Sequence, residues 1–248
     1  MAYGFGYIGS KNHIAEQIIE QLPTADYFVD LFAGGCSVTH CAILSGKFTN
    51  YIVNDWNTHP MNLLRDTIKG DNLTKENEWV SRERFNDEKA SDPLIRYCWS
   101  YGNNGKDYIY SKQLEPIKEN AHSMYMETGR KTIRLQHLEN LNRLKRVHAD
   151  FSKVEPRLEI HSTDFERVEI PNNGVIYCDI PYKGRKAYDT APFDYERFYE
   201  WARRQKNIYI SEYEMPEGFT CVAEWQRRCT LAHQRKFPTV ERLFVPTA

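Results

Sequence analysis

The sequence predicts an α/β fold in which a mostly parallel sheet carries a mainly helical insertion. Five short runs in the 248 residues are almost continuously apolar and rich in β-branched and aromatic residues, as strands covered on both faces are. Segments with helical character separate these runs, and this alternation is typical of parallel sheets. The alternation stops after Ile68, and no further parallel strand is expected before Arg157. The interval between these two residues is therefore predicted to be an inserted lobe.

Each expected helix lies beside a strand in the chain, where a parallel sheet needs a crossover connection. The helices are expected at Ile14–Leu22, Val38–Ser45, Pro60–Ile68 and Tyr195–Gln205. The parallel strands are expected at Tyr27–Phe32, Tyr51–Asp55, Arg157–His161, Val175–Asp179 and Ile208–Tyr213. Two further apolar runs flank a loop that contains Arg227, Arg228, Arg235 and Lys236, and they should finish the sheet as antiparallel strands: Thr220–Trp225 and Val240–Pro246.

The predicted lobe spans residues 70–150 and interrupts a catalytic domain made of residues 1–69 and 151–248. Its sequence is polar, aromatic and mainly helical in pattern. Asn104-Gly105 lies between W-S-Y-G-N and K-D-Y-I-Y, which is a strong hairpin signal. Towards the end of the lobe, an apolar stripe at helical spacing predicts an amphipathic helix; it consists of Leu135, Leu138, Leu141 and Leu144.

The composition limits the classes of protein to consider. The chain is 41% hydrophobic, which suffices for a core, and its formal net charge is −1. A nucleic acid would therefore have to be bound by a local basic face rather than by overall charge. The six cysteines form no C-x-x-C pair and the eight histidines are scattered, so no metal site is expected. The N-terminus does not resemble a signal peptide and no run is long enough to span a bilayer, so we expect a soluble, cytoplasmic protein.

A glycine pair follows the first predicted strand in D-L-F-A-G-G-C-S-V, residues 30–38. A strand, a glycine turn and a helix form the arrangement through which an open α/β sheet binds a cofactor, although the pair also suits a plain tight turn. The second strand ends at Asp55, roughly 20 residues further on, where an acid can accept both hydroxyls of a nucleotide ribose. Alternatively, Asp55 caps the helix that starts near Pro60. A nicotinamide cofactor remains an alternative, but the three-glycine fingerprint is missing.

The stretch G-V-I-Y-C-D-I-P-Y, residues 174–182, ends a buried strand on an acid and continues with a proline and an aromatic ring. Asp179 is expected at the carboxyl end of the strand, which is the edge where open α/β sheets bind ligands. Pro181 stiffens the turn and sets the angle of Tyr182. A carboxylate and a backbone carbonyl can accept both hydrogens of a planar amino group while the ring stacks on the base. This combination suits a nucleobase that has been rotated out of its stack.

D-I-P-Y resembles the D-P-P-Y motif of amino-methyltransferases, and the order of motifs resembles that of Dam-type DNA adenine-N6 methyltransferases. In that family, Y-x-G-x-K precedes D-L-F-x-G-G-x-S-V, and an insertion that recognises the target separates both from D-P-P-Y. The resemblance covers nearly the whole chain, and S-Y-G-N-N-G-K-D-Y-I-Y and E-R-L-F-V-P are similar to phage and mobile-element members. The matching segments are Y-I-G-S-K at 7–11, D-L-F-A-G-G-C-S-V at 30–38, N-D-W-N at 54–57, T-D-F at 163–165 and D-I-P-Y at 179–182.

The resemblance implies a fold, a cofactor and roles for individual residues. The fold would be the Rossmann-like sheet of S-adenosylmethionine-dependent methyltransferases, with the lobe recognising the DNA target. Asp55 would bind the ribose hydroxyls of S-adenosylmethionine, and Asp164 and Phe165 would hold its adenine. The catalytic set would be Asp179, Ile180, Pro181 and Tyr182, which grip the target adenine. The implied cofactor site comprises Tyr7, Lys11, Asp30, Phe32, Ala33, Gly34, Asp55, Asp164, Phe165 and Asp179.

One residue departs from the family pattern, because Ile180 stands where the family has a proline. The role at this position belongs to a backbone carbonyl, which isoleucine also supplies. The change alters the stiffness of the loop and adds an N–H donor, and we expect activity to survive it. An Asp at the first position of the motif, as at Asp179, is by resemblance better suited to adenine than to cytosine.

Candidates for DNA contacts lie on both sides of the predicted site. Lys183, Arg185 and Lys186 directly follow the D-I-P-Y turn and are the first candidates for phosphate contacts. The leucine-striped stretch is basic, and it either tracks phosphates or forms a solvated amphipathic helix; its cations are Arg130, Lys131, Arg134, Arg143, Lys145 and Arg146. Three residues of the predicted hairpin either reach base edges in a major groove or serve only the turn: Asn103, Asn104 and Lys106.

The motifs together predict a site-specific DNA adenine-N6 methyltransferase that uses S-adenosylmethionine and extrudes an adenine from duplex DNA. Two alternatives stay open. The same pocket could act on RNA adenine, on cytosine N4 in DNA or on a protein glutamine, or Ile180 could mark a copy that binds DNA without catalysis. Ser211, Glu212 and Tyr213, after the fifth strand, either shape the pocket or only satisfy backbone groups. The sequence predicts neither the recognition site nor the oligomeric state, nor whether a restriction partner exists.

Overall fold

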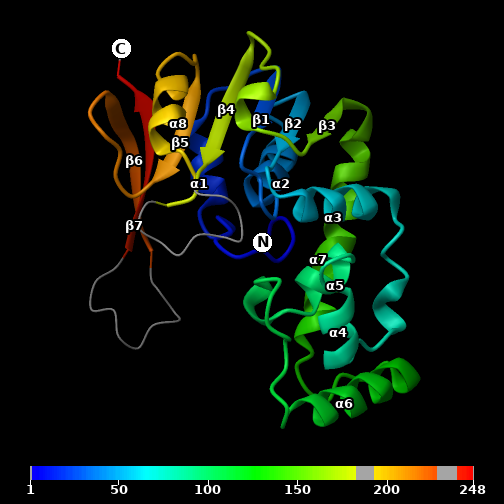
Figure 1. Cartoon of the computed structure of the whole chain (residues 1–248). Helices are drawn as coiled ribbons and strands as arrows, with labels where there is room; N and C mark the ends of the chain where they lie inside the picture. The colour runs from blue at the N-terminus through cyan, green and yellow to red at the C-terminus, as the bar shows by residue number, and fades with distance from the viewer. Residues whose placement is uncertain (1, 183–192, 228–238, 248) are drawn as a thin grey trace.

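The computed structural model describes residues 2–182, 193–227 and 239–247, and within them seven strands form one sheet in the order β3-β2-β1-β4-β5-β7-β6 (Figure 1). The first five strands pair in parallel, and β7 pairs antiparallel with both β5 and β6. The predicted mostly parallel α/β sheet with an antiparallel finish is therefore confirmed. The strands are β1 (Tyr27–Asp30), β2 (Asn50–Asn54), β3 (Leu158–His161), β4 (Gly174–Asp179), β5 (Ile208–Glu212), β6 (Phe219–Arg227) and β7 (Thr239–Pro246).

The centre of the sheet is β1, which lies between β2 and β4 at the point where the strand order reverses. Val29 of β1 is in register with Ile52 of β2 and with Ile176 of β4. Because the three strands are parallel and in register, the residues that end them meet at one edge of the sheet. Ligands of open α/β sheets bind at such a reversal, beyond the carboxyl ends of the strands.

Helices cover both faces of the sheet (Figure 1). On one face, α1 and α2 pack against Phe28 and Tyr177. On the other face, α8 packs against Val29 and Ile176. The alternation of Phe28 and Val29 along β1 shows why a continuous apolar run was needed, since a strand buried on both faces has no solvent side. These helices are α1 (Ala15–Gln21), α2 (Ser37–Ser45) and α8 (Tyr195–Ala202).

α3 (Thr58–Lys69) starts two residues before its predicted position at Pro60. The Asn57 side chain caps it by accepting a hydrogen bond from the His59 amide at 3.1 Å, and Gly70 ends it in the left-handed conformation. Proline tolerates the first turn of a helix because its missing N–H has no partner there. Pro60 is therefore a residue inside the first turn and not the start of the helix.

The segment between α3 and β3 is mainly helical, as predicted, and within it the structure assigns no strand. The leucine stripe lies on α7, where Leu138, Leu141 and Leu144 are buried in one apolar cluster with Leu64 of α3. The elements of the segment are η1 (Lys75–Asn77), α4 (Arg82–Glu88), α5 (Pro93–Cys98), η2 (Tyr101–Asn103), α6 (Glu115–Thr128), α7 (Gln136–Phe151) and η3 (Ser152–Arg157); η4 (Phe165–Arg167) follows β3.

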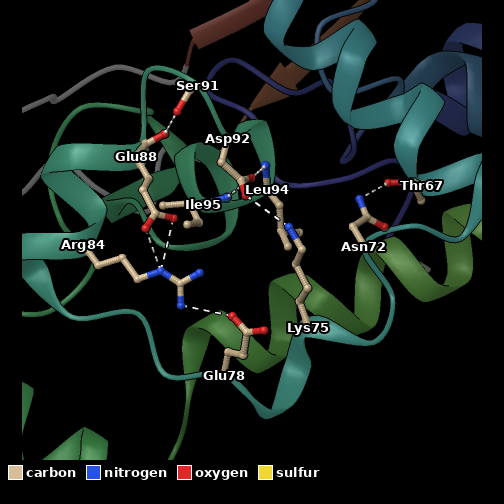
Figure 2. A network of polar contacts seen from close by, with 10 residues as sticks. All are labelled: Thr67, Asn72, Lys75, Glu78, Arg84, Glu88, Ser91, Asp92, Leu94 and Ile95. Carbon is tan, nitrogen blue, oxygen red and sulfur yellow. Dashed lines mark hydrogen bonds and ion pairs between the residues drawn. The ribbon is translucent and has the colours of Figure 1, made fainter.

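Ion pairs hold the start of this segment together, as Figure 2 shows. Arg84 of α4 contacts both Glu78 and Glu88 at 3.0 Å. Asp92 caps α5 and also accepts a hydrogen bond from Lys75 at 3.3 Å. An open pocket of about 410 Å³ is lined by Lys75, Glu88 and Asp92 among others. Since they are largely engaged with one another, we interpret the pocket as part of the packing of the segment.

The expected hairpin at Asn104-Gly105 is wrong in form, although the chain does reverse there. Ser100 and Tyr108 form one isolated antiparallel bridge, and η2 lies in the loop between them. The Asn104 side chain accepts hydrogen bonds from the amides of Lys106 and Asp107. Local side-chain bonds of this kind stabilise a loop in place of a longer ladder.

Among the residues that the structure describes, no helix combines the length and apolar composition that a membrane crossing requires.

Candidate active site

Three carboxylates lie at or just beyond the carboxyl ends of the central strands. Asp30 ends β1, Asp179 ends β4, and Asp55 follows β2. Burial, helped by the nearby Asp179 charge, raises the pKa of Asp30 to about 7 and that of Asp55 to about 6. An edge with this concentration of acids favours a positively charged ligand or side chain.

Lys11 supplies one positive charge to this edge. Its side chain is only 6% exposed, and Nζ donates a hydrogen bond to Asp179 Oδ1 at 2.6 Å. Nζ also lies 4.5 Å from the centroid of the Tyr182 ring, which is within the range of a cation–π contact. The N-terminal segment and the D-I-P-Y corner, far apart in the sequence, thus form one cluster.

The glycine turn after β1 accommodates the N-terminal segment. Gly34 has φ +47°, and a Cβ atom there would lie 2.8 Å from the Tyr7 ring. At Gly35 a Cβ atom would lie 2.6 Å from Tyr7 Cβ, while the Phe5 amide donates to the Gly35 carbonyl at 3.0 Å. In the structure these glycines make room for Tyr7 and Phe5, and the cofactor contact expected at this turn stays a prediction.

Asp55 joins two turns at this edge. Its Oδ2 accepts a hydrogen bond from the Gly34 amide and its Oδ1 accepts one from the Asn57 amide, both at 2.8 Å. The helix cap itself is Asn57, so Asp55 is not the N-cap of α3. The acid instead fixes the glycine turn of β1 relative to the turn after β2, at the place where the ribose-binding acid was predicted.

The D-I-P-Y corner is anchored by packing and by hydrogen bonds. The Ile180 side chain is 1% exposed and belongs to the apolar cluster beneath α8. Tyr195 of α8 donates a hydrogen bond to the Pro181 carbonyl at 2.9 Å. Tyr182 donates to Glu241 Oε2 at 2.5 Å and meets the Tyr213 ring in a T-shaped contact, with centroids 4.4 Å apart. The isoleucine therefore holds the corner by burial, where a second proline would hold it by its ring.

The T-D-F segment lies beside the same edge. Asn54 binds it on both sides, because Nδ2 donates to the Thr163 carbonyl at 3.1 Å and Oδ1 accepts from the Thr163 amide at 3.0 Å. Asp164 accepts a hydrogen bond from Arg197 at 2.5 Å. Phe165 is buried in a cluster of aromatic rings that also contains Phe32, with a centroid distance of 5.8 Å between the two rings. Ala33 is buried next to Phe32 in the chain.

The residues predicted to contact DNA differ in where the structure places them. Lys183, Arg185 and Lys186 lie outside the described residues. Asn103 donates to the Tyr97 carbonyl at 2.7 Å and its side chain fills the space over Gly6, which ties η2 to the N-terminal segment. These contacts and those of Asn104 favour the turn interpretation for both asparagines. Lys106, in the same loop, is exposed.

The basic stretch of the lobe does not form one continuous basic face. Arg143 points inward and donates to the Tyr3 carbonyl at 3.0 Å. Arg134 is paired with Glu139 at 2.7 Å. Arg130 and Lys131, in the connection between α6 and α7, are exposed.

Sequence reasoning missed Glu241 as part of the cluster. It lies on β7, is 2% exposed, and accepts the Tyr182 hydroxyl. A signal was present, because Glu241 lies two residues before the apolar Leu243 and so on the same inward face of the strand, where a carboxylate needs a polar partner. Ser211, by contrast, bonds the Tyr177 hydroxyl at 2.8 Å within the core, a side-chain partner that neither interpretation of this residue named.

Comparison with known proteins agrees with this geometry. The family model for D12 class N6 adenine-specific DNA methyltransferases matches residues 7–209 of the 248. A search of curated proteins found no match. The matched region contains the glycine turn, Asp55, the helical segment and the D-I-P-Y corner. The chain therefore belongs to the D12 class of N6 adenine-specific DNA methyltransferases and is a DNA adenine methyltransferase.

Proposed function

We propose that the protein transfers a methyl group from S-adenosylmethionine to N6 of an adenine that is rotated out of duplex DNA at a specific sequence. The observation that carries this proposal is the corner at the end of β4. There Asp179 and Tyr182 lie on either side of a buried Ile180, and Lys11 contacts both of them.

The residues at the sheet edge suit S-adenosylmethionine, which supplies an electrophilic methyl group on a positively charged sulfur. Asp30, Asp55 and Asp179 bring three carboxyl groups to the edge, and a nearby positive charge would favour their ionised forms. Phe32 and Phe165 offer aromatic surface for an adenine. We assign the cofactor to these residues together with Tyr7, Lys11, Ala33, Gly34 and Asp164. In this assignment Asp55 binds the ribose hydroxyls.

The protein's own contribution is to position the target amino group. Asp179 and the Ile180 carbonyl accept its two N–H bonds, and acceptance outside the plane of the base favours a pyramidal nitrogen whose lone pair is free to attack. Tyr182 stacks on the base. Alignment of this kind contributes most to the rate at such a site, since effective molarities for well-oriented groups reach roughly 10⁵ M and above.

Lys11 already contacts the carboxylate that the target adenine needs. Its Nζ donates a hydrogen bond to Asp179 Oδ1, and an ionised carboxylate has several lone pairs with which to accept further hydrogen bonds. In the proposed complex, Lys11 keeps its bond and fixes the rotation of the carboxylate, while the carboxylate also accepts the amino group.

The division of labour follows the boundaries predicted from the sequence. We propose that residues 1–69 and 151–248 bind the donor and catalyse transfer, and that residues 70–150 recognise the DNA target. The contacts of Asn103 with Tyr97 and over Gly6 connect this lobe to the N-terminal segment that covers the glycine turn.

The test is incubation with labelled S-adenosylmethionine and duplex DNA of mixed sequence, followed by nucleoside analysis. Label on N6 of adenine is expected. Label on cytosine N4, or on RNA or protein offered in parallel, would overturn the substrate assignment. A protein that binds DNA but shows no binding of S-adenosylmethionine by calorimetry would be the non-catalytic copy.

Asp179→Ala should reduce transfer by about 1,000-fold, because one of two acceptors for the amino group is lost. Circular dichroism should show an unchanged fold, since Asp179 lies at the edge of the sheet with 21% of its side chain exposed. Glu159→Gln, a change on the outer strand β3, is the control and should keep wild-type activity. Substantial activity in the Asp179 variant would contradict the role assigned to this carboxylate.

A further inference from the structure

Glu241 brings a buried carboxylate to the D-I-P-Y corner from outside the region that the family model matches. It lies on β7, beyond residue 209, and only 2% of it is exposed. Burying a carboxylate costs free energy unless charged or polar partners compensate for the lost water. The partners of Glu241 therefore indicate why this side chain is kept at an inward position.

Two of those partners are residues of the proposed site. Glu241 Oε2 accepts a hydrogen bond from the Tyr182 hydroxyl at 2.5 Å, and the same oxygen lies 4.0 Å from Lys11 Nζ. Lys11 in turn bonds Asp179 at 2.6 Å and lies over the Tyr182 ring. Glu241 is thus in contact with the ring that stacks on the base and with the cation that fixes the acceptor.

The hydroxyl bond determines how the Tyr182 ring is oriented. Pro181 restrains the backbone before the ring, but a tyrosine side chain still rotates about two side-chain bonds. A hydrogen bond at the far end of the ring, together with the T-shaped contact to Tyr213 at 4.4 Å, removes that freedom. A charge-assisted bond is suited to this purpose because it is short and strongly directional.

We propose that Glu241 is a positioning residue for methyl transfer: it orients the Tyr182 ring through its hydroxyl and shares Lys11 with Asp179, so that ring and acceptor are in place before the adenine arrives. This inference rests on the proposed function, and it adds β7 to the elements that build the active site.

The kinetic test compares single-turnover methylation rates at saturating donor and DNA. Glu241→Ala should lower the rate about 10- to 100-fold, because small misplacements of reacting groups cost that much, and should change DNA affinity little. Glu241→Gln retains an acceptor for the hydroxyl and should recover most of the rate. Glu224→Gln, a change on the paired strand β6 where 66% of the side chain is exposed, should match the wild type.

A double-mutant cycle separates positioning from general support of the fold. Tyr182→Phe keeps the ring and removes the hydroxyl. If Glu241 acts mainly through that hydroxyl, Glu241→Ala should slow the Tyr182→Phe protein far less than it slows the wild type. The inference would be overturned if the rate of the double variant fell by the product of the two single-variant losses, or if Glu241→Ala kept the wild-type rate.

A measurement without turnover keeps this inference separate from the proposed function. In protein labelled with ¹³C at the tyrosine ring, the Tyr182 signal is assigned by its loss in Tyr182→Phe. Glu241→Gln should shift this signal while Glu224→Gln leaves it in place, and an unmoved signal would refute the contact. Failure of the wild type to methylate any DNA would instead refute the proposed function and leave the result of the ¹³C measurement intact.

Discussion

At the scale of single residues, the role proposed for Asp55 would make donor binding depend on pH. Burial raises the pKa of this carboxyl to about 6, so the group titrates close to neutrality. An ionised carboxylate accepts both ribose hydroxyls, whereas a protonated one keeps only part of this capacity. The proposed donor should therefore bind more weakly as the pH falls through about 6.

Calorimetry with S-adenosylmethionine at several pH values checks this prediction. Between pH 7.5 and pH 5 the ionised fraction of a group with this pKa falls about tenfold, and the affinity should fall by the same factor. Asp55→Asn should bind weakly at both values, without the step near pH 6. Because the pKa of Asp30 is also raised, to about 7, a step that persists in the Asp55 variant would assign the effect to Asp30.

Ile180 shows that the D-I-P-Y corner can be restrained by packing in place of a proline ring. Proline restricts the backbone covalently, but an isoleucine that is 1% exposed restricts it by packing. The apolar cluster that receives Ile180 includes Phe198 of α8, and Tyr195 of the same helix bonds the Pro181 carbonyl. The rigidity of the corner thus depends on α8, which a motif comparison alone does not reveal.

At the scale of elements, the strands were predictable because a strand buried on both faces must be apolar throughout. β4 was expected from Val175 to Asp179 and forms from Gly174 to Asp179. The loop at Asn104-Gly105 was predicted less well, because side-chain bonds to the backbone replaced the strand pairs that its sequence favours. Glu241 was missed because its partner Tyr182 is far away in the chain, and a pairing of that range is fixed only by the sheet order.

The glycine turn illustrates the same limit. The sequence shows that glycines stand at positions 34 and 35. It does not show which atoms approach them closely enough to exclude a side chain. In the structure these atoms belong to Tyr7 and Phe5. A local pattern predicts the conformation of a turn, whereas the neighbour that requires it comes from the packing of a distant segment.

α6 and α7 share a buried pair of histidines that should make the lobe sensitive to acid. His122 Nδ1 lies 3.0 Å from His137 Nε2, and the Tyr110 hydroxyl lies 2.7 Å from His137 Nδ1. Burial, and then the nearby His122, lower the pKa of His137 to about 3. In the unfolded chain His137 takes up a proton below about pH 6.5, whereas in the folded protein it stays neutral to a lower pH. Its contribution to the free energy of unfolding is therefore fully present above pH 6.5 and is lost as the pH falls.

Urea unfolding between pH 7 and pH 4 tests the histidine pair. His137 should contribute a loss of about 1 kcal/mol per pH unit below pH 6. Because the pKa values of Asp30 and Asp55 are raised in the folded protein, these two groups make it more stable as the pH falls through part of this range. The effect of His137 must therefore be taken from the difference between the His137 variant and the wild type. His137→Gln should flatten the acid loss, and His161→Gln, on the outer strand β3, should keep it. Identical slopes for all three proteins would contradict the buried-histidine account.

At the scale of the whole molecule, a formal net charge of −1 gives no general attraction to DNA. Affinity must come from local basic faces, and each phosphate contact releases counterions and steepens the dependence on salt. Within the described part of the lobe, Arg143 and Arg134 are engaged in contacts inside the protein. Arg130 and Lys131, exposed between α6 and α7, are the better candidates for phosphate contacts from the lobe.

Replacing Arg130 and Lys131 together by glutamine should therefore weaken binding to duplex DNA of any sequence and lower the slope of log affinity against log salt by about 1 to 2. The matched control replaces Arg204 and Lys206, which are also exposed but precede β5 and so lie at the amino ends of the parallel strands, opposite the active site. The control removes the same charge and should leave the slope unchanged. Equal effects of the two double variants would mean that overall charge governs binding, and no effect of the first would exclude this part of the lobe from the DNA interface.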